Sequence, residues 1–266
     1  MRICLLMVAL MLLVARPALA DDYEQWLNGA TAIRLPSEGE WRVLLGAGGG
    51  YAPNYSGSDE YEAVSLPLID IEWRGAVFLS TQRGLGYNMV RKRDTMAGPR
   101  LTYDLGRKSA DSTALTGLPD IKSSPELGLF FKHFSGPWRF TSDIRMGLTD
   151  KGHNGVTGSF GTAVGGRISE RANLFLGADL RWGGSDYMNS YYGVSANASN
   201  TTLASFSASA GVRDISGFAT VVYLFSPQLY LSTEGRLQLL VSTAAESPVT
   251  KSSELLFVGT TLGYMF

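Results

Sequence analysis

The chain has 266 residues, of which 45% are hydrophobic and 18% charged, and its formal net charge is −1. This balance excludes the strongly basic surface of a typical nucleic-acid-binding protein. Cys4 is the only cysteine, so an internal disulfide and a cysteine-based metal site are excluded as well.

The first twenty residues have the features of a secretory signal peptide. Arg2 supplies a positive start, residues 3–15 are apolar, and Ala18 to Ala20 form a small-x-small cleavage site. A retained membrane anchor fits less well, because the apolar run is short and Pro17 follows it. We therefore expect residues 1–20 to be removed. We expect residues 21–40 to be a loose periplasmic lead and residues 41–266 to form one domain.

Residues 46–62, GAGGGYAPNYSGSDEYE, are rich in glycine and could be taken for a phosphate-binding loop. The dinucleotide fingerprint needs a third glycine where Tyr51 stands, and a P-loop needs a lysine that is missing here. The polar residues that follow are typical of a turn and not of a helix. The stretch is therefore interpreted as a strand, near 41–51, that leads into a loop.

Apolar and polar residues alternate through most of the remaining chain. In residues 138–149, Trp138, Ile144 and Met146 fall on one parity, whereas Asp143 and Arg145 fall on the other. Successive side chains of a strand point to opposite sides, so one face is apolar and the other charged. The same pattern recurs in residues 97–105, 173–183, 229–241 and 253–266.

Alternation also occurs in a secreted β-sandwich, which remains the alternative fold. A membrane barrel is favoured because the strands span about ten residues or more, as a bilayer-crossing strand requires. Aromatic residues lie near the strand ends, as in an interfacial girdle; they are Trp41, Tyr51, Trp73, Trp138, Trp182 and Tyr264. The sequence thus predicts an all-β fold, a transmembrane antiparallel β-barrel of about 12 strands, within a range of 10–14.

Twelve strands are expected in this barrel. They lie near residues 41–51, 62–73, 75–90, 97–105, 124–134, 137–149, 156–168, 172–184, 203–213, 215–225, 228–240 and 253–266. This count places the long segments 106–123 and 185–202 on the periplasmic side. That placement conflicts with the short periplasmic turns of known barrels, and a miscounted strand would explain the conflict.

Several blocks resemble the MipA/OmpV family of outer-membrane proteins. They are the glycine-rich block with the strand after it, RGLGYNM at 83–89, LTGLPDI at 115–121, SDYMNSYYGV at 185–194, AGVRD at 210–214 and the terminal LGYMF. The resemblance covers essentially the whole mature chain and implies an outer-membrane barrel of a Gram-negative cell. The family's named member interacts with the lytic transglycosylase MltA and is thought to link it to a peptidoglycan synthase. Other members are described as porin-like or as adhesins.

Two classes of function follow. The first is a non-enzymatic scaffold that binds cell-wall enzymes from the periplasm, in addition to its contact with outer-membrane lipid. Its expected partner-binding residues are Leu118, Tyr187, Tyr191 and Tyr192, because exposed aromatic anchors commonly dominate interfaces. The second is a porin-like channel for small solutes. No catalytic residue, cofactor or metal is expected for either function.

Two short motifs carry weaker hypotheses. His133 and Ser135 share a strand face, a His-x-Ser arrangement that an outer-membrane lipid hydrolase could use, although no asparagine partner is evident. A polar turn residue is the simpler interpretation of His133. Residues 91–93, RKR, are expected at the outer side, either against lipopolysaccharide phosphates or as a solvated loop end.

Overall fold

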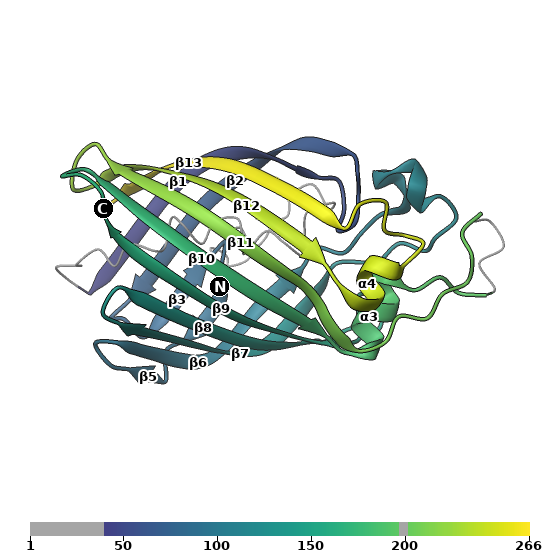
Figure 1. Cartoon of the computed structure of the whole chain (residues 1–266). Helices are drawn as coiled ribbons and strands as arrows, with labels where there is room; N and C mark the ends of the chain where they lie inside the picture. The colour runs from purple at the N-terminus through teal and green to yellow at the C-terminus, as the bar shows by residue number, and fades with distance from the viewer. Residues whose placement is uncertain (1–39, 197–201) are drawn as a thin grey trace.

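The computed structural model describes residues 40–196 and 202–266, so the expected signal peptide, the segment 21–39 and residues 197–201 lie outside it. The described chain forms one antiparallel sheet that curls into a barrel (Figure 1). Its strands are β1 (Trp41–Pro53), β2 (Tyr61–Trp73), β3 (Val77–Ser80), β4 (Gly84–Tyr87), β5 (Val90–Arg91), β6 (Thr95–Asp104), β7 (Ser124–Ser135), β8 (Trp138–Gly147), β9 (Val156–Arg167), β10 (Ala172–Gly183), β11 (Gly211–Leu224), β12 (Leu229–Leu240) and β13 (Glu254–Met265). Short helices occur in the connections: η2 (Ser109–Asp111), η3 (Thr113–Leu115), α3 (Ser185–Tyr192) and α4 (Ser242–Glu246).

The barrel is closed and has twelve strands, as predicted. β1 pairs with β13, which joins the first and last strands of the chain, and β4 pairs with β6 at Leu85–Leu101 and Gly86–Arg100, which joins the two ends of the sheet order. β4 and β5 both pair with β6 and are two pieces of one strand, interrupted at Asn88 and Met89. Counted together, they bring the thirteen strand segments of the described chain to twelve.

Two of the expected strands are wrong, and the two errors cancel in the count. The predicted strand 75–90 is a hairpin, in which β3 turns at 81–83 into β4. The predicted strand 203–213 is mostly not a strand: β11 begins only at Gly211, and before it Phe206 forms an isolated bridge with Val194. Because the hairpin adds one strand, every strand from β6 to β10 runs in the opposite direction to the one expected.

This reversal corrects the placement of the long segments. The connection 105–123 and residues 184–196 and 202–210 lie at the same end of the barrel as the β1–β2 loop, opposite the C-terminus. Figure 1 shows α3 and α4 at that end, called here the loop end. The other end, called the turn end, carries the C-terminus and the connections 74–76, 92–94, 136–137, 168–171 and 225–228. The expectation that segments 106–123 and 185–202 share the side of the termini is therefore wrong.

The two faces of the wall match the predicted alternation. Leu176, Leu180 and Trp182 of β10 are exposed on the outer face, while Arg181, between them in sequence, is buried on the inner face. The six expected girdle aromatics are all exposed near strand ends, and Trp41 and Trp73 lie side by side with ring centroids 6.2 Å apart. A continuous apolar outer surface of this kind is what contact with lipid requires.

No helix in the described ranges is long and apolar enough to cross a membrane.

The glycine-rich stretch lies at the seam that closes the barrel. Gly46, Gly48 and Gly50 face β13, and a Cβ atom on any of them would lie 2.3–2.7 Å from a backbone oxygen of β13. Real Cβ atoms do not come this close, so the seam needs residues without a side chain at these positions. The predicted strand-to-loop transition is confirmed, with β1 extending to Pro53 and β2 beginning at Tyr61.

The outer-face assignment makes a direct prediction for Leu176. This side chain is 49% exposed in the middle of β10, where it faces the membrane interior. We expect Leu176→Arg to lower the free energy of unfolding by about 2–4 kcal/mol, because a basic group near the midplane loses its hydration. A urea titration in lipid vesicles measures the effect, with Leu176→Ala as the uncharged control. Equal losses for both variants would contradict the assignment.

Candidate functional site

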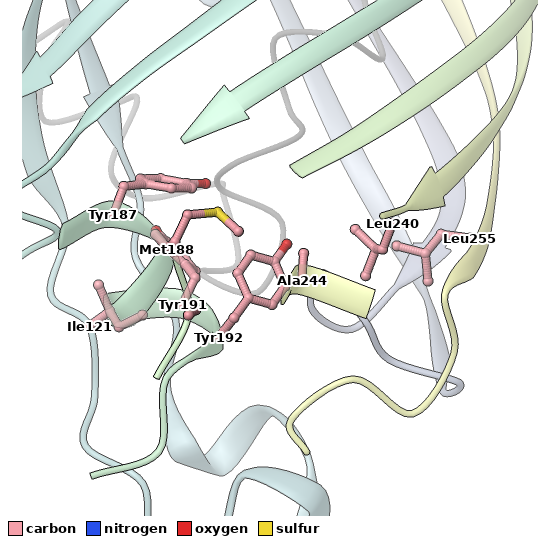
Figure 2. Packing of buried hydrophobic residues seen from close by; sticks show 9 residues of the cluster. Ile121, Tyr187, Met188, Tyr191, Tyr192, Leu240, Ala244 and Leu255 are labelled. Atoms are coloured by element: carbon pink, nitrogen blue, oxygen red, sulfur yellow. The ribbon is translucent and has the colours of Figure 1, made fainter. Parts of the chain in front are cut away.

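Helix α3 forms a cap at the loop end of the barrel. One face of the helix presents Tyr187, Met188, Tyr191 and Tyr192, all buried. They belong to a cluster, called here the cap cluster, that also contains Ile121, Ala208, Leu240, Ala244 and Leu255. Figure 2 shows these side chains converging between α3, α4 and the ends of β12 and β13. Burial of this apolar face fixes the helix to the barrel rim.

Polar contacts of the helix reach several sides of the rim. The Tyr191 hydroxyl donates to Asp104 at the end of β6, with distances of 2.7 and 2.9 Å to its two carboxylate oxygens. The Tyr187 hydroxyl accepts a hydrogen bond from Arg213 at the start of β11. The Tyr192 hydroxyl is 2.8 Å from Ser56 Oγ in the β1–β2 loop. The three tyrosines thus combine apolar burial with a polar anchor each.

A buried histidine lies beneath this cap. His153, in the β8–β9 loop, has its Nε2 3.0 Å from Glu126 and 3.8 Å from Asp104. Its ring meets Tyr187 edge to face, with centroids 5.0 Å apart. Asp104 therefore contacts both the cap, through Tyr191, and the buried pair of His153 and Glu126 below it.

A second apolar cluster joins the loops outside the cap. It contains Tyr55, Leu115, Leu118, Val194 and Val249. The Tyr55 hydroxyl donates to the backbone oxygen of Val249 at 3.0 Å. Burial, together with the nearby Asp59 carboxylate, raises the pKa of Tyr55 to about 12, so this hydroxyl keeps its proton.

The barrel interior is lined by ion pairs that run along the wall. Arg42 and Arg83 both bind Asp70, at 3.0 and 2.9 Å, beside Glu72. On another part of the wall, further pairs join Arg100 to Asp143, Arg145 to Asp143 and Glu126, Arg181 to Asp214, and Arg236 to Asp179 and Glu234. Arg83 is in the turn between β3 and β4, and each of the other pairs joins groups on one strand or on strands no more than two apart. The charges are thus neutralised on their own section of wall.

The expected partner-binding residues lie in the capped end. Leu118 is in the outer apolar cluster, and Tyr187, Tyr191 and Tyr192 are in the cap cluster. Each is at most 5% exposed, so the expectation that they are exposed anchors is wrong. The reason is the helix, which the sequence reading missed: it turns the three tyrosines inward together. Their role in partner binding stays a prediction.

The two weaker motifs lie near the turn end. His133 is on the outer face of β7, where its Nδ1 is 2.9 Å from Thr95 Oγ1 and its ring stacks on Phe131. The hydrogen bond that His133 makes is therefore to a threonine, and it does not activate Ser135 as a hydrolase would require. Residues 91–93 run from the last residue of β5 into the 92–94 connection at the turn end, so the expectation that they lie at the end opposite the termini is wrong. Within residues 40–196 and 202–266, no group of three or more His, Cys, Asp or Glu residues is arranged to hold a metal ion.

Comparison with known families identifies residues 45–266 as matching the family model described as MltA-interacting protein MipA. No curated protein matches the sequence.

Solved structures of outer-membrane proteins are among those similar to this chain, at very low sequence identity. An outer-membrane channel of the COG4313 group from Pseudomonas putida F1 is 10% identical, with a TM-score of 0.46, over 88% of this chain and 98% of that chain. The KdgM porin is 8% identical, with a TM-score of 0.43, over 84% and 99%. The NanC porin is 8% identical, with a TM-score of 0.41, over 84% and 98%.

Proposed function

The chain belongs to the MltA-interacting protein MipA family, and from this premise we propose that it is a non-enzymatic outer-membrane scaffold. In this role its turn end binds a lytic transglycosylase and connects it to a peptidoglycan synthase. Barrels of bacterial outer membranes have short turns on the periplasmic side and longer loops outside. This rule supports placing the turn end toward the periplasm, where cell-wall enzymes work.

The observation that carries the proposal is the charge of the turn end. The connections and adjoining strand ends there expose six cations against Glu40, Asp94 and Glu170; the cations are Arg74, Arg91, Lys92, Arg93, Arg167 and Arg171. The loop-end connections carry more acidic than basic residues in the described chain. A basic rim favours an acidic partner surface, because complementary charge speeds association and selects partners.

The densest part of this rim gives a direct test. We expect replacing Lys92 and Arg93 together by serine to weaken binding of a purified lytic transglycosylase roughly tenfold, or about 1.4 kcal/mol, since two exposed ion pairs contribute this much. The difference in affinity between the wild type and this variant should shrink as the salt concentration rises, because salt screens exposed charges. Binding is measured by co-sedimentation with the protein in vesicles.

A matched control removes the same charge from the loop end. Lys108 and Lys122 are exposed there, and their double replacement by serine should leave binding unchanged. Full binding by the turn-end variant, together with lost binding by the loop-end variant, would reject docking at the turn end.

A porin-like channel is the second candidate. The observation that favours it is the interior, where ion pairs run along the wall and keep a charged surface toward the lumen. A charged surface of this kind is suited to contact with water and ions. Stepwise conductance of the wild-type protein in planar bilayers would support a channel, and silence at all voltages would count against it.

A further inference from the structure

The loop end carries a pocket that neither proposed function uses. Its volume is about 650 Å³, within the range of sites for small molecules. Three parts of the chain line it: the β6–β7 connection with Arg107 and residues 118–121, the β8–β9 loop at 150–152, and the end of α3 together with residues 193–196 and 205–207. The pocket thus lies where separate loops converge on the cap, and the inference does not depend on the scaffold role.

Arg107 distinguishes this pocket from an ordinary surface hollow. Four arginines of the described chain are at most 5% exposed: Arg107, Arg181, Arg213 and Arg236. The last three each bind a carboxylate, at 2.8, 2.7 and 2.5 Å. Arg107 forms no ion pair within 4.0 Å with any carboxylate of residues 40–196 or 202–266. A buried guanidinium without a counter-ion is costly, and proteins usually pair such a charge.

The helix explains the position of Arg107 but not its missing counter-charge. Arg107 Nη1 donates to the backbone oxygen of Tyr191 at 2.5 Å, near the C-terminus of α3, where a cation is favourable. A carbonyl is neutral, and the guanidinium has five donors. Its Nε is buried without a hydrogen-bond partner among the described residues. Burial lowers the pKa of Arg107, and the neighbouring tyrosines and Asp111 oppose this shift only in part.

The other charges of the pocket do not replace a counter-ion. Asp120 and Asp150 line it but are exposed to solvent, as is Lys151. Asp120 already accepts a hydrogen bond from the Ser109 backbone at 2.8 Å. Exposed carboxylates are screened by water, whereas a ligand held against Arg107 would meet it in a low-dielectric environment.

We propose that this pocket binds a small hydroxylated solute through an oxyanion, a carboxylate or a phosphate, that pairs with Arg107. The planar guanidinium matches both oxyanions with two parallel hydrogen bonds. Ser205 and Ser207, which are exposed and also line the pocket, offer hydroxyl groups to the rest of the solute.

Three sugars that differ mainly in charge test the proposal on the wild-type protein. Glucuronate carries a carboxylate, glucose 6-phosphate carries a phosphate, and glucose carries neither. Calorimetric titration of the folded protein in detergent should show saturable binding of at least one anion and none of glucose. Binding of glucuronate alone would identify the site with carboxylates, and binding of glucose 6-phosphate alone with phosphates. Equal behaviour of all three sugars would overturn the proposal.

Variants then assign the binding to Arg107. Arg107→Gln should reduce affinity for the bound anion roughly tenfold or more, since a charged hydrogen bond is lost. Arg107→Lys should retain part of it, and Lys151→Gln should change it little. Near-ultraviolet circular dichroism reports whether the cap tyrosines keep their packing in each variant. Wild-type affinity in a well-packed Arg107→Gln protein would also overturn the proposal.

Discussion

Replacing Tyr191 and Tyr192 together by serine is expected to release the cap and raise the conductance of the barrel. Both side chains are buried in the cap cluster, and each hydroxyl holds a separate part of the rim, Asp104 and Ser56. Truncating a buried aromatic residue costs about 3–5 kcal/mol, so the double change exceeds what a single short helix can compensate. The strand ladders do not involve these residues, so the barrel itself should still assemble.

The measurement compares single-channel conductance in planar bilayers with binding of a lytic transglycosylase. Higher conductance with unchanged binding is expected, because the cap is at the loop end and the proposed docking surface at the turn end. Ser190→Ala is a suitable control, since Ser190 is on the same helix but does not belong to the cap cluster. Lost transglycosylase binding with unchanged conductance would instead restore the tyrosines as partner-binding residues.

Removing the charge of Arg236 is expected to destabilise the whole barrel. This side chain is 2% exposed and binds Asp179 at 2.5 Å, Glu234 at 3.1 Å and Ser216 at 3.0 Å. Its guanidinium also lies over the Phe218 ring, 4.5 Å from the centroid. Arg236→Met would leave two carboxylates without their cation. Breaking a buried pair in this way costs about 3–5 kcal/mol.

Neutralising the whole group should restore much of this loss. The triple variant Asp179→Asn, Glu234→Gln, Arg236→Met removes the three charges together, and such replacements are often close to neutral in stability. Lys251→Met, in an exposed loop, is the control for removal of a cation. Urea titrations in vesicles decide the matter: if Arg236→Met and the triple variant unfold at the same denaturant concentration, the loss came from packing and not from charge.

Alternation was informative wherever a strand is flanked by lipid on one side and the lumen on the other. In β8, β10, β12 and β13 most of the predicted outer residues are exposed and none is buried, because the bilayer requires an apolar side chain at every second position. Alternation failed to reveal the β3–β4 hairpin. Its turn at 81–83 has three residues, so Leu79 and Leu85 keep the same parity and the pattern continues through the turn. Gly84, with φ of +74°, was the local signal of a turn.

The candidate site depended on contacts that a linear pattern does not contain. The sequence by itself determined the barrel, the faces of its strands and the family resemblance, because these follow from local periodicity and from motifs. Only the tertiary structure decided that the tyrosines of α3 are buried and that Arg107 is the one arginine among the four most buried in the described chain without a carboxylate. Tyr191 meets Asp104 across 87 positions of the sequence, and Ser56 meets Tyr192 across 136. Such pairs are set by which ends of the strands the closed sheet brings together, and that depends on the direction of every strand between them.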